Sequence, residues 1–138
     1  MGSAINIVEQ DTHTSPQGKC ERLHDLRVWQ QGIELVKQIY LITKEGNISR
    51  DFGLRDQLRR AAVSVPTNVA EGFERHSRKE YVNFLNIAKG SAGEVRSLLR
   101  VALEVGYLDK NTYLRLYDMA KGLSRMLASQ IQAINRLL

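Results

Sequence analysis

The sequence contains little cysteine, proline or histidine, and it has no long apolar run. Among its 138 residues there are one cysteine, two prolines and three histidines. Cys20 alone excludes a disulfide within the chain, and no segment reaches the roughly 18 consecutive apolar residues of a membrane-spanning helix. The N-terminus lacks the basic and then apolar order of a signal peptide. We therefore expect a cytoplasmic protein with no membrane partner, and the scarcity of proline and glycine favours helices.

Motifs of the common enzyme classes are also missing. The sequence contains no Walker loop, no GxGxxG and no GxSxG. A di-iron site in a helical bundle uses two Glu-x-x-His motifs, and this chain has one, from Glu21 to His24. Cys20 has no CxxC companion, and the histidines are scattered along the chain. These absences lead us to expect no enzyme activity, no metal site and no cofactor.

Positive charge is what the sequence has in excess. The 20 lysines and arginines outnumber the 15 acidic residues, and residues 26–138 hold 18 of the former against 11 of the latter. The part that carries the apolar periodicity is therefore the basic part. Such a surface fits an acidic partner such as nucleic acid, although many basic domains are only soluble.

The spacing of apolar residues predicts a flexible N-terminal arm over residues 1–24 and one four-helix bundle domain over residues 25–138. The expected helices cover residues 26–44, 53–73, 78–105 and 110–138. In the first, the buried face is expected to hold Trp29, Ile33, Val36 and Tyr40. In the last, the apolar stripe runs to Leu138. Because the connections are short, we expect an all-α, up-down-up-down arrangement.

Residues that start, stop or bend helices fall between these segments. We expect N-caps at Asp25, Ser77 and Asp109, helix ends at Gly46 and Gly106, and a polar connection over residues 47–52. Pro66 lies inside the second helix and predicts a kink near residues 62–66, because it removes one backbone donor and clashes with the carbonyl of Ala62. Ser64 or Thr67 is expected to bond the carbonyl group released there.

The central stretch resembles the four-helix-bundle proteins of the 23S ribosomal RNA intervening-sequence family. The resemblance lies in residues 26–30 (LRVWQ), 53–54 (GL), 57–72 (QLRRAAVSVPTNVAEG), 84–85 (FL) and 106–108 (GYL), together with Ala88, Gly90, Ser91 and Glu94. It covers roughly residues 25–138, and the run over residues 57–72 is far more specific than a short motif. Residues 46–50 depart from the family, which commonly has a Phe-Pro turn there, and this leaves the local loop shape open.

The resemblance implies a left-handed bundle of bacterial origin that assembles into a homopentameric ring. It also implies a link to RNA, because such proteins are encoded within elements inserted into ribosomal RNA genes. A related branch, the accessory protein of diversity-generating retroelements, contacts nucleic acid and a reverse transcriptase. An element-encoded protein is therefore a second kind of partner to expect.

The third helix carries a line of cations at near-integral numbers of turns, which we name the basic seam. It consists of Arg78, Lys89, Arg96 and Arg100. Lys121 and Arg125 are expected on the outer face of the last helix as a second basic surface. Such a line can follow a phosphate backbone. The alternative is a solvated flank balanced by acids on a neighbouring helix.

The opposite flank of the third helix is apolar, and we name it the apolar strip. It holds Ile87, Gly90, Ser91, Leu98, Val101 and Val105. A second apolar face beside the core needs another surface to cover it. That surface is either another copy of the chain, which would make the strip an oligomer interface, or helices two and four of the same chain.

Polar residues follow one edge of the second helix, and we name them the polar ladder. The ladder holds Gln57, Arg60, Ser64, Asn68 and Glu71, and Glu94 of the third helix is a candidate partner for Arg60 or Arg59. Arg60 and Glu71 lie about 16 Å apart along the axis, so each needs a partner elsewhere. We interpret the ladder as a structural hydrogen-bond network. The alternative is a catalytic row that uses Arg60 and Glu71.

These patterns lead to a first hypothesis of a non-catalytic, ring-forming bundle that binds RNA or a ribonucleoprotein through charge and shape. The second hypothesis is a protein-interaction scaffold that does not bind nucleic acid directly. An enzyme based on the polar ladder is the third.

Overall fold

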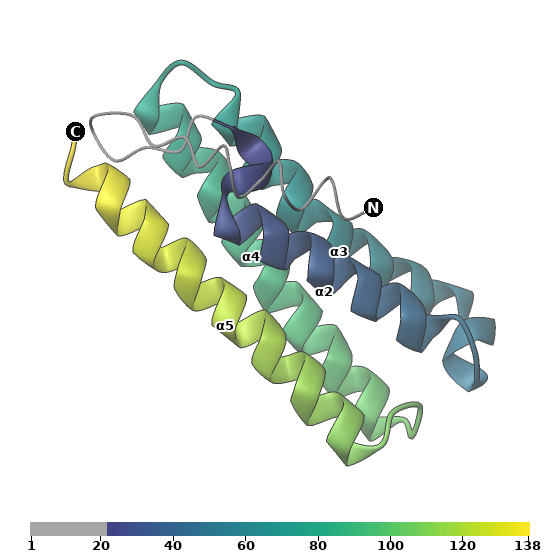
Figure 1. Ribbon diagram of the computed structural model, residues 1–138. Helices are drawn as coiled ribbons and strands as arrows, with labels where there is room; N and C mark the ends of the chain where they lie inside the picture. The colour runs from purple at the N-terminus through teal and green to yellow at the C-terminus, as the bar shows by residue number, and fades with distance from the viewer. Residues whose placement is uncertain (1–21) are drawn as a thin grey trace, which may run out of the picture.

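The computed structural model describes residues 22–138 as four long helices and two short 3-10 turns (Figure 1). The elements in chain order are η1 (Leu23–Asp25), α2 (Arg27–Thr43), η2 (Asn47–Arg50), α3 (Phe52–Phe73), α4 (Arg78–Glu104) and α5 (Lys110–Asn135). Residues 22–138 contain no strand, so the all-helical class is confirmed for this part. The predicted arm lies outside the described residues, apart from its last three positions.

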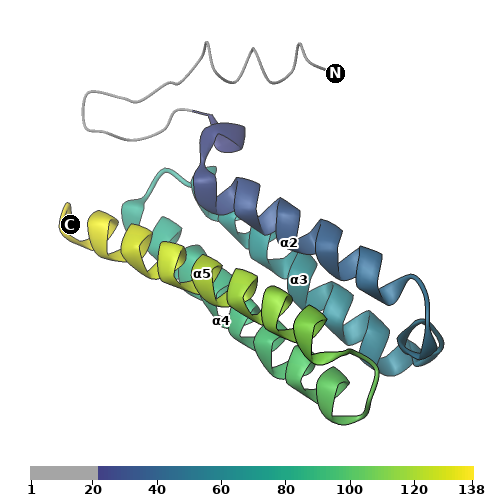
Figure 2. The ribbon, with the colours of Figure 1, turned by 60° about the horizontal axis from the view of Figure 1, so that its bottom comes forward.

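Consecutive helices run in opposite directions and pack side by side. Helix α4 packs against α3 on one side and α5 on the other, and α2 packs against α3 and less extensively against α5. The α2–α3 and α4–α5 connections lie at one end of the molecule, and the α3–α4 connection lies at the other with the C-terminus (Figures 1 and 2). The up-down-up-down order follows, whereas the handedness of the bundle stays a prediction.

The core lies between the four helices and is built from aliphatic side chains. Fully enclosed side chains come from every helix and include Leu35, Ile39, Leu58, Val65, Leu85, Val95, Leu99, Leu116 and Leu127. Burial of each such side chain stabilises the folded state by about 1.5–3 kcal/mol relative to an exposed position. Across residues 22–138, every helix is too short or too polar to span a lipid bilayer.

The predicted buried face of the first helix is wrong. The observed buried face is rotated by one residue, or about 100° around the helix axis, from the predicted one. Ile33 and Tyr40 are 43% and 42% exposed, and Trp29 and Val36 are only partly buried. The buried residues are instead Val28, Gly32, Leu35, Ile39 and Thr43, which repeat with the same helical spacing one position earlier. Apolar residues occur around most of this helix, so periodicity alone did not select the face.

A glycine explains which face of α2 turns inward. A Cβ built on Gly32 would lie 3.2 Å from the Cβ of Pro66 on α3. The missing side chain lets the backbone of α2 approach the buried proline ring closely, and a larger residue would hold the two helices apart. Pro66 is buried within α3, while the kink predicted around it stays a prediction.

Most helix ends follow the predicted signals. Ser77 accepts a hydrogen bond from the backbone of Glu80 at the start of α4, and Asp109 accepts one from Thr112 at the start of α5. Hydrogen bonds from Thr112, and to a lesser extent from the backbone of Asn111, hold the pKa of Asp109 below its usual value. Gly106 has a φ of +84° and ends α4.

Five local predictions fail. Gly46 does not end the first helix, because α2 stops at Thr43 with Lys44 as its C-cap, and Gly46 precedes the η2 turn. Asp25 does not cap α2, because it lies in the 3-10 turn before it and pairs with Arg22. The expected polar connection over residues 47–52 forms a 3-10 turn that buries Ile48, and α3 begins within it at Phe52. Thr67 bonds the carbonyl of Val63, not that of Ala62. Leu138 is exposed, so the apolar stripe of α5 stops before the last residue.

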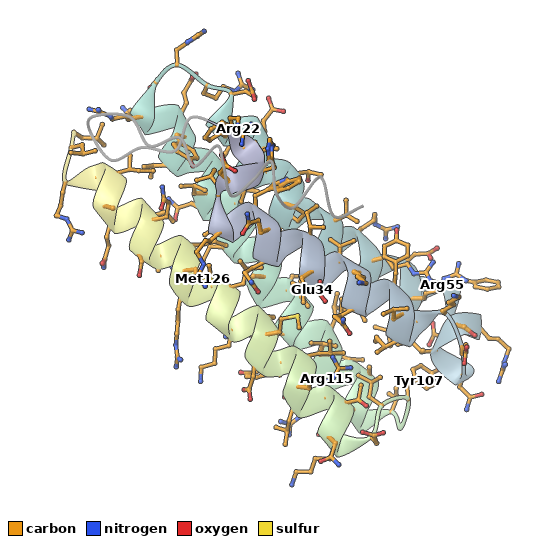
Figure 3. All side chains as sticks on the ribbon, in the orientation of Figure 1. Arg22, Glu34, Arg55, Tyr107, Arg115 and Met126 are labelled. Atoms are coloured by element: carbon orange, nitrogen blue, oxygen red, sulfur yellow. The ribbon has the colours of Figure 1, made fainter. Side chains whose placement is uncertain are left out.

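A hydrogen bond ties the two connections at one end of the bundle. The hydroxyl of Tyr107, which follows α4, donates to Asp51 Oδ2 at 2.9 Å, and Asp51 Oδ1 accepts from the backbone of Leu54 at the start of α3. Tyr107 is labelled at this end in Figure 3. One carboxylate therefore caps α3 and anchors the α4–α5 loop, and the hydrogen bond raises the pKa of Tyr107.

Candidate nucleic-acid interface

The two ends of the basic seam are engaged by neighbouring groups. Arg78 donates to the carbonyl oxygen of Leu137 at 3.3 Å. Arg100 pairs with Glu104 one turn along the same helix at 2.8 Å, and hydrogen bonds to Tyr113 and Glu104 raise the pKa of Arg100. Tyr113 lies in α5, and Leu137 lies just beyond its end. The seam therefore lies on the side of α4 that faces α5.

The middle of the basic seam carries charge that no carboxylate of residues 22–138 pairs with. The guanidinium of Arg96 is half-buried and lies over the ring of Tyr117 on α5, 6.0 Å from its centroid. Its Nε is buried and has no hydrogen-bond partner among residues 22–138. Lys89 is exposed, and neither cation forms an ion pair within the described chain. The alternative, a flank balanced by acids on a neighbouring helix, finds no ion pair to support it at these two positions within residues 22–138.

The cations predicted on the last helix continue this charge. Tyr117, Lys121 and Arg125 follow one another at intervals of four residues and therefore lie on one side of α5. Because α4 and α5 are antiparallel and Arg96 lies over Tyr117, Lys89 lies level with the stretch from Lys121 to Arg125. Both α5 cations are exposed, and neither is in an ion pair within residues 22–138.

The structure thus brings the two predicted basic groups together. We name Lys89, Arg96, Lys121 and Arg125 the α4–α5 basic surface. Beyond Tyr117 it leads into an open depression of about 650 Å³ between the two helices. This depression is lined by Arg100, Leu103, Lys110, Tyr113, Leu114, Tyr117 and Asp118. Asp118 is the one carboxylate in that lining, against the cations Arg100 and Lys110.

The apolar strip is left open by the helices of its own chain. Ile87, Val101 and Val105 are 51%, 43% and 56% exposed, and Leu98 is partly buried. A Cβ built on Gly90 meets no atom within 4 Å. Ser91 differs from the rest, because it is buried at the contact between α4 and α3.

Two residues of the polar ladder form a connected hydrogen-bond network with Ser91 between α3 and α4. The hydroxyls of Ser64 and Ser91 lie 2.8 Å apart, and Asn68 donates to Ser64 Oγ at 2.9 Å and to its carbonyl at 2.8 Å. This group links the two helices that pack together most extensively. Ser91, expected in the oligomer interface, belongs to this network instead.

The remaining polar residues do not converge. Glu71 pairs with Arg75 in its own helix, and Arg59 turns to α2, so it is not a partner of Glu94. Gln57, Arg60 and Glu94 are exposed. Within residues 22–138, Arg60 and Glu94 form no ion pair, and no three His, Cys, Asp or Glu side chains group as metal ligands.

The residues that sequence reasoning missed lie on the other side of the molecule. Lys37, Tyr40 and Leu41 of α2 line a depression of about 430 Å³ together with Lys44, which caps the end of α2, and Arg59 of α3. The signal was present, because Lys37, Tyr40 and Lys44 recur at spacings of three and four. It was obscured by the assignment of Tyr40 to the core.

Comparisons with known proteins give the family from the sequence and the fold from a solved structure. A family model described as 23S rRNA-intervening sequence protein matches residues 24–129. A solved structure of a protein of unknown function, from the S23 ribosomal protein family of Bacteroides thetaiotaomicron, has the same fold with a TM-score of 0.69. It is 24% identical, and the match covers 75% of this chain and 97% of that chain. No curated protein matches. The chain belongs to the 23S rRNA-intervening sequence protein family.

Proposed function

We propose that this protein is a non-catalytic helical bundle that assembles into a ring and binds RNA phosphates through the α4–α5 basic surface. The observation that carries the proposal is the uncompensated charge of this surface. Arg96, Lys89, Lys121 and Arg125 form no ion pair within residues 22–138. A partner with closely spaced negative charges would satisfy them, and the phosphate backbone of RNA has this property.

The way Arg96 is held supports a role in recognition. Arg96 is partly buried, and its guanidinium lies over Tyr117, so part of its hydration is already lost before any ligand arrives. A planar guanidinium donates two parallel hydrogen bonds to a phosphate. Lys89 and Lys121 lie at exposed positions near it and contribute point charges. We expect these side chains to recognise RNA by its charge and shape, because none of them belongs to a sequence motif that contacts base edges.

The non-catalytic part of the proposal rests on the arrangement of the polar ladder. Ser64 and Asn68 are engaged with each other and with Ser91, and Glu71 is paired with Arg75. A catalytic row would need a base, an acid and a substrate cavity in mutual reach. The depression along α3 brings together only Ser64 and Arg60 from the ladder.

Assembly into a ring is supported by the apolar strip. Three large apolar side chains, Ile87, Val101 and Val105, are about half exposed along α4. Gly90 offers space beside them for a second backbone to approach. Several large apolar side chains exposed on one face of a helix mark a site of protein contact more often than a free surface. The family resemblance suggests five copies for the ring.

The test is the affinity of charge variants for a structured RNA. The triple variant Lys89→Gln, Lys121→Gln and Arg125→Gln removes three exposed cations and leaves the Arg96 contact intact. We expect weaker binding, and the slope of log K against log salt concentration falls by about 0.9 for each lost phosphate contact. The matched control is Arg27→Gln, Arg50→Gln and Lys79→Gln, which removes the same charge from exposed positions elsewhere.

The outcomes separate the hypotheses. Weaker binding in the triple variant, with the control unchanged, supports the surface. Equal losses in both variants would mean that only net charge matters, and the α4–α5 basic surface would be rejected. Absence of any RNA binding by the unaltered protein at low salt would favour a scaffold that meets an acidic or element-encoded protein.

A further inference from the structure

The depression between α2 and α3 contains a fixed arginine. The guanidinium of Arg59 lies 4.4 Å from the centroid of the Tyr40 ring, and its Nε donates to Thr43 Oγ1 at 2.8 Å. Thr43 is fully buried, and its hydroxyl donates to the carbonyl of Ile39 at 2.7 Å. The plane of the guanidinium is therefore set by a chain of contacts that ends in the backbone of α2.

Two lysines add charge to the same depression. Lys37 and Lys44 line it and are exposed, and neither is in an ion pair within the described residues. The acidic side chain nearest to Arg59 along α3 is Asp56. It pairs with Arg55 at 2.9 Å, and that contact, more than the charge of Arg59, lowers the pKa of Asp56. Glu45 follows Lys44 in the chain but forms no ion pair with it.

Apolar surface lies beside these cations. Leu41 is 50% exposed, and the exposed part of Tyr40 borders both this depression and the adjoining one along α3. A free anion needs only the cations. A flat, apolar ring attached to a phosphate would use the leucine, the Tyr40–Arg59 stack and the lysines together, and this combination describes a nucleotide.

We propose that the depression lined by Lys37, Tyr40, Leu41, Lys44 and Arg59 binds an unpaired nucleotide of single-stranded RNA. The base packs on the Tyr40–Arg59 stack and Leu41, because bases stack on arginine planes and aromatic rings. Lys37 and Lys44 contact the flanking phosphates. This inference rests on the proposed function for the class of ligand but uses a different surface, on the α2–α3 side of the molecule.

The test uses the full chain and two labelled RNA probes, a short unstructured strand and a duplex. In the variant Lys37→Gln and Lys44→Gln, two phosphate contacts are lost. Each contributes about 0.7 to the slope of log K against log salt concentration, so this slope for the single strand should fall by about 1.4. The duplex affinity stays unchanged. Arg59→Lys keeps the charge but removes the plane, and we expect about tenfold weaker binding of the single strand. Melting by circular dichroism verifies that each variant folds.

Two further variants distinguish this site from the α4–α5 basic surface. The charge control is Arg27→Gln and Lys79→Gln, and it should bind the single strand as the unaltered protein does. If Lys121→Gln and Arg125→Gln weaken binding of the single strand while Lys37→Gln and Lys44→Gln do not, the α2–α3 site is overturned and the proposed function stands. The reverse result supports the α2–α3 site, and the α4–α5 basic surface is then judged by the structured-RNA titration alone. Equal losses in the charge control, or no binding of the single strand at low salt, would overturn the site.

Discussion

At the scale of single residues, Gly72 and Gly122 differ in what surrounds them. A Cβ built on Gly72 would lie 2.8 Å from the Cβ of Phe84, whereas one on Gly122 meets nothing within 4 Å. We expect Gly72→Ala to lower the free energy of unfolding by about 1–3 kcal/mol through overpacking. Gly122→Ala should raise it by up to about 1 kcal/mol, because alanine is the better helix former. Urea unfolding of both variants measures the contrast, and a stabilised Gly72→Ala would contradict the α3–α4 packing described here.

The hydroxyl of Tyr107 gives a second prediction at this scale. It donates to Asp51, which raises the pKa of Tyr107 above its usual value. A raised pKa in the folded state means that the contact stabilises fully below the ordinary tyrosine pKa of about 10 and is lost as pH rises through the raised value. We therefore expect Tyr107→Phe to melt at a lower temperature near neutral pH, with the gap closing in strong alkali.

The control for this prediction is Tyr117→Phe. The Tyr117 hydroxyl forms no hydrogen bond within the described residues, so this variant should melt like the unaltered protein across the same pH range. A Tyr107→Phe variant with an unchanged melting temperature at neutral pH would show that the link between the two loops contributes nothing.

At the scale of helices, the sequence predicted the elements better than their orientation. The caps at Ser77 and Asp109 and the glycine end at Gly106 place the starts of α4 and α5 and the end of α4 within a residue or two. These signals act locally, so they can be read without knowing the neighbours. The fourth helix of the bundle likewise follows from its regular apolar stripe.

The inward face of α2 could not be read in the same way. Two stripes one residue apart are both apolar, and the choice between them depends on Pro66 of α3, which packs against Gly32. The contact joins residues 34 positions apart, so no local pattern reports it. Because Tyr40 was assigned to the buried face, the depression around Tyr40 and Arg59 was not predicted either.

For the α4–α5 basic surface, the spacing of cations within each helix could be predicted from the sequence, but the position of one helix against the other could not. Helical spacing aligns the cations of α4 on one line, and it aligns Lys121 with Arg125 on α5. That these two rows adjoin depends on the register between the helices, which the contact of Arg96 with Tyr117 fixes. The ion pair of Glu71 with Arg75 was missed, although its spacing of four residues is a local signal.

At the scale of the whole molecule, the apolar strip predicts self-association. The chain has a mass of 15.7 kDa, and we expect light scattering at micromolar concentration to give a multiple of it. Ile87→Lys places a charge in the strip, where the side chain is half exposed, and should dissociate the assembly without unfolding the chain. Leu114→Lys is the matched control, because Leu114 is also an exposed apolar residue but lies on α5. A monomeric mass for the unaltered protein would reject the ring.

We propose that the α4–α5 basic surface of this bundle binds the phosphate backbone of RNA. The most direct measurement is a titration of the unaltered protein with a labelled structured RNA over a range of salt concentrations. We predict binding at low salt whose affinity falls steeply and linearly on logarithmic axes as salt rises. Absence of binding at low salt, or an affinity that does not change with salt, would contradict the account.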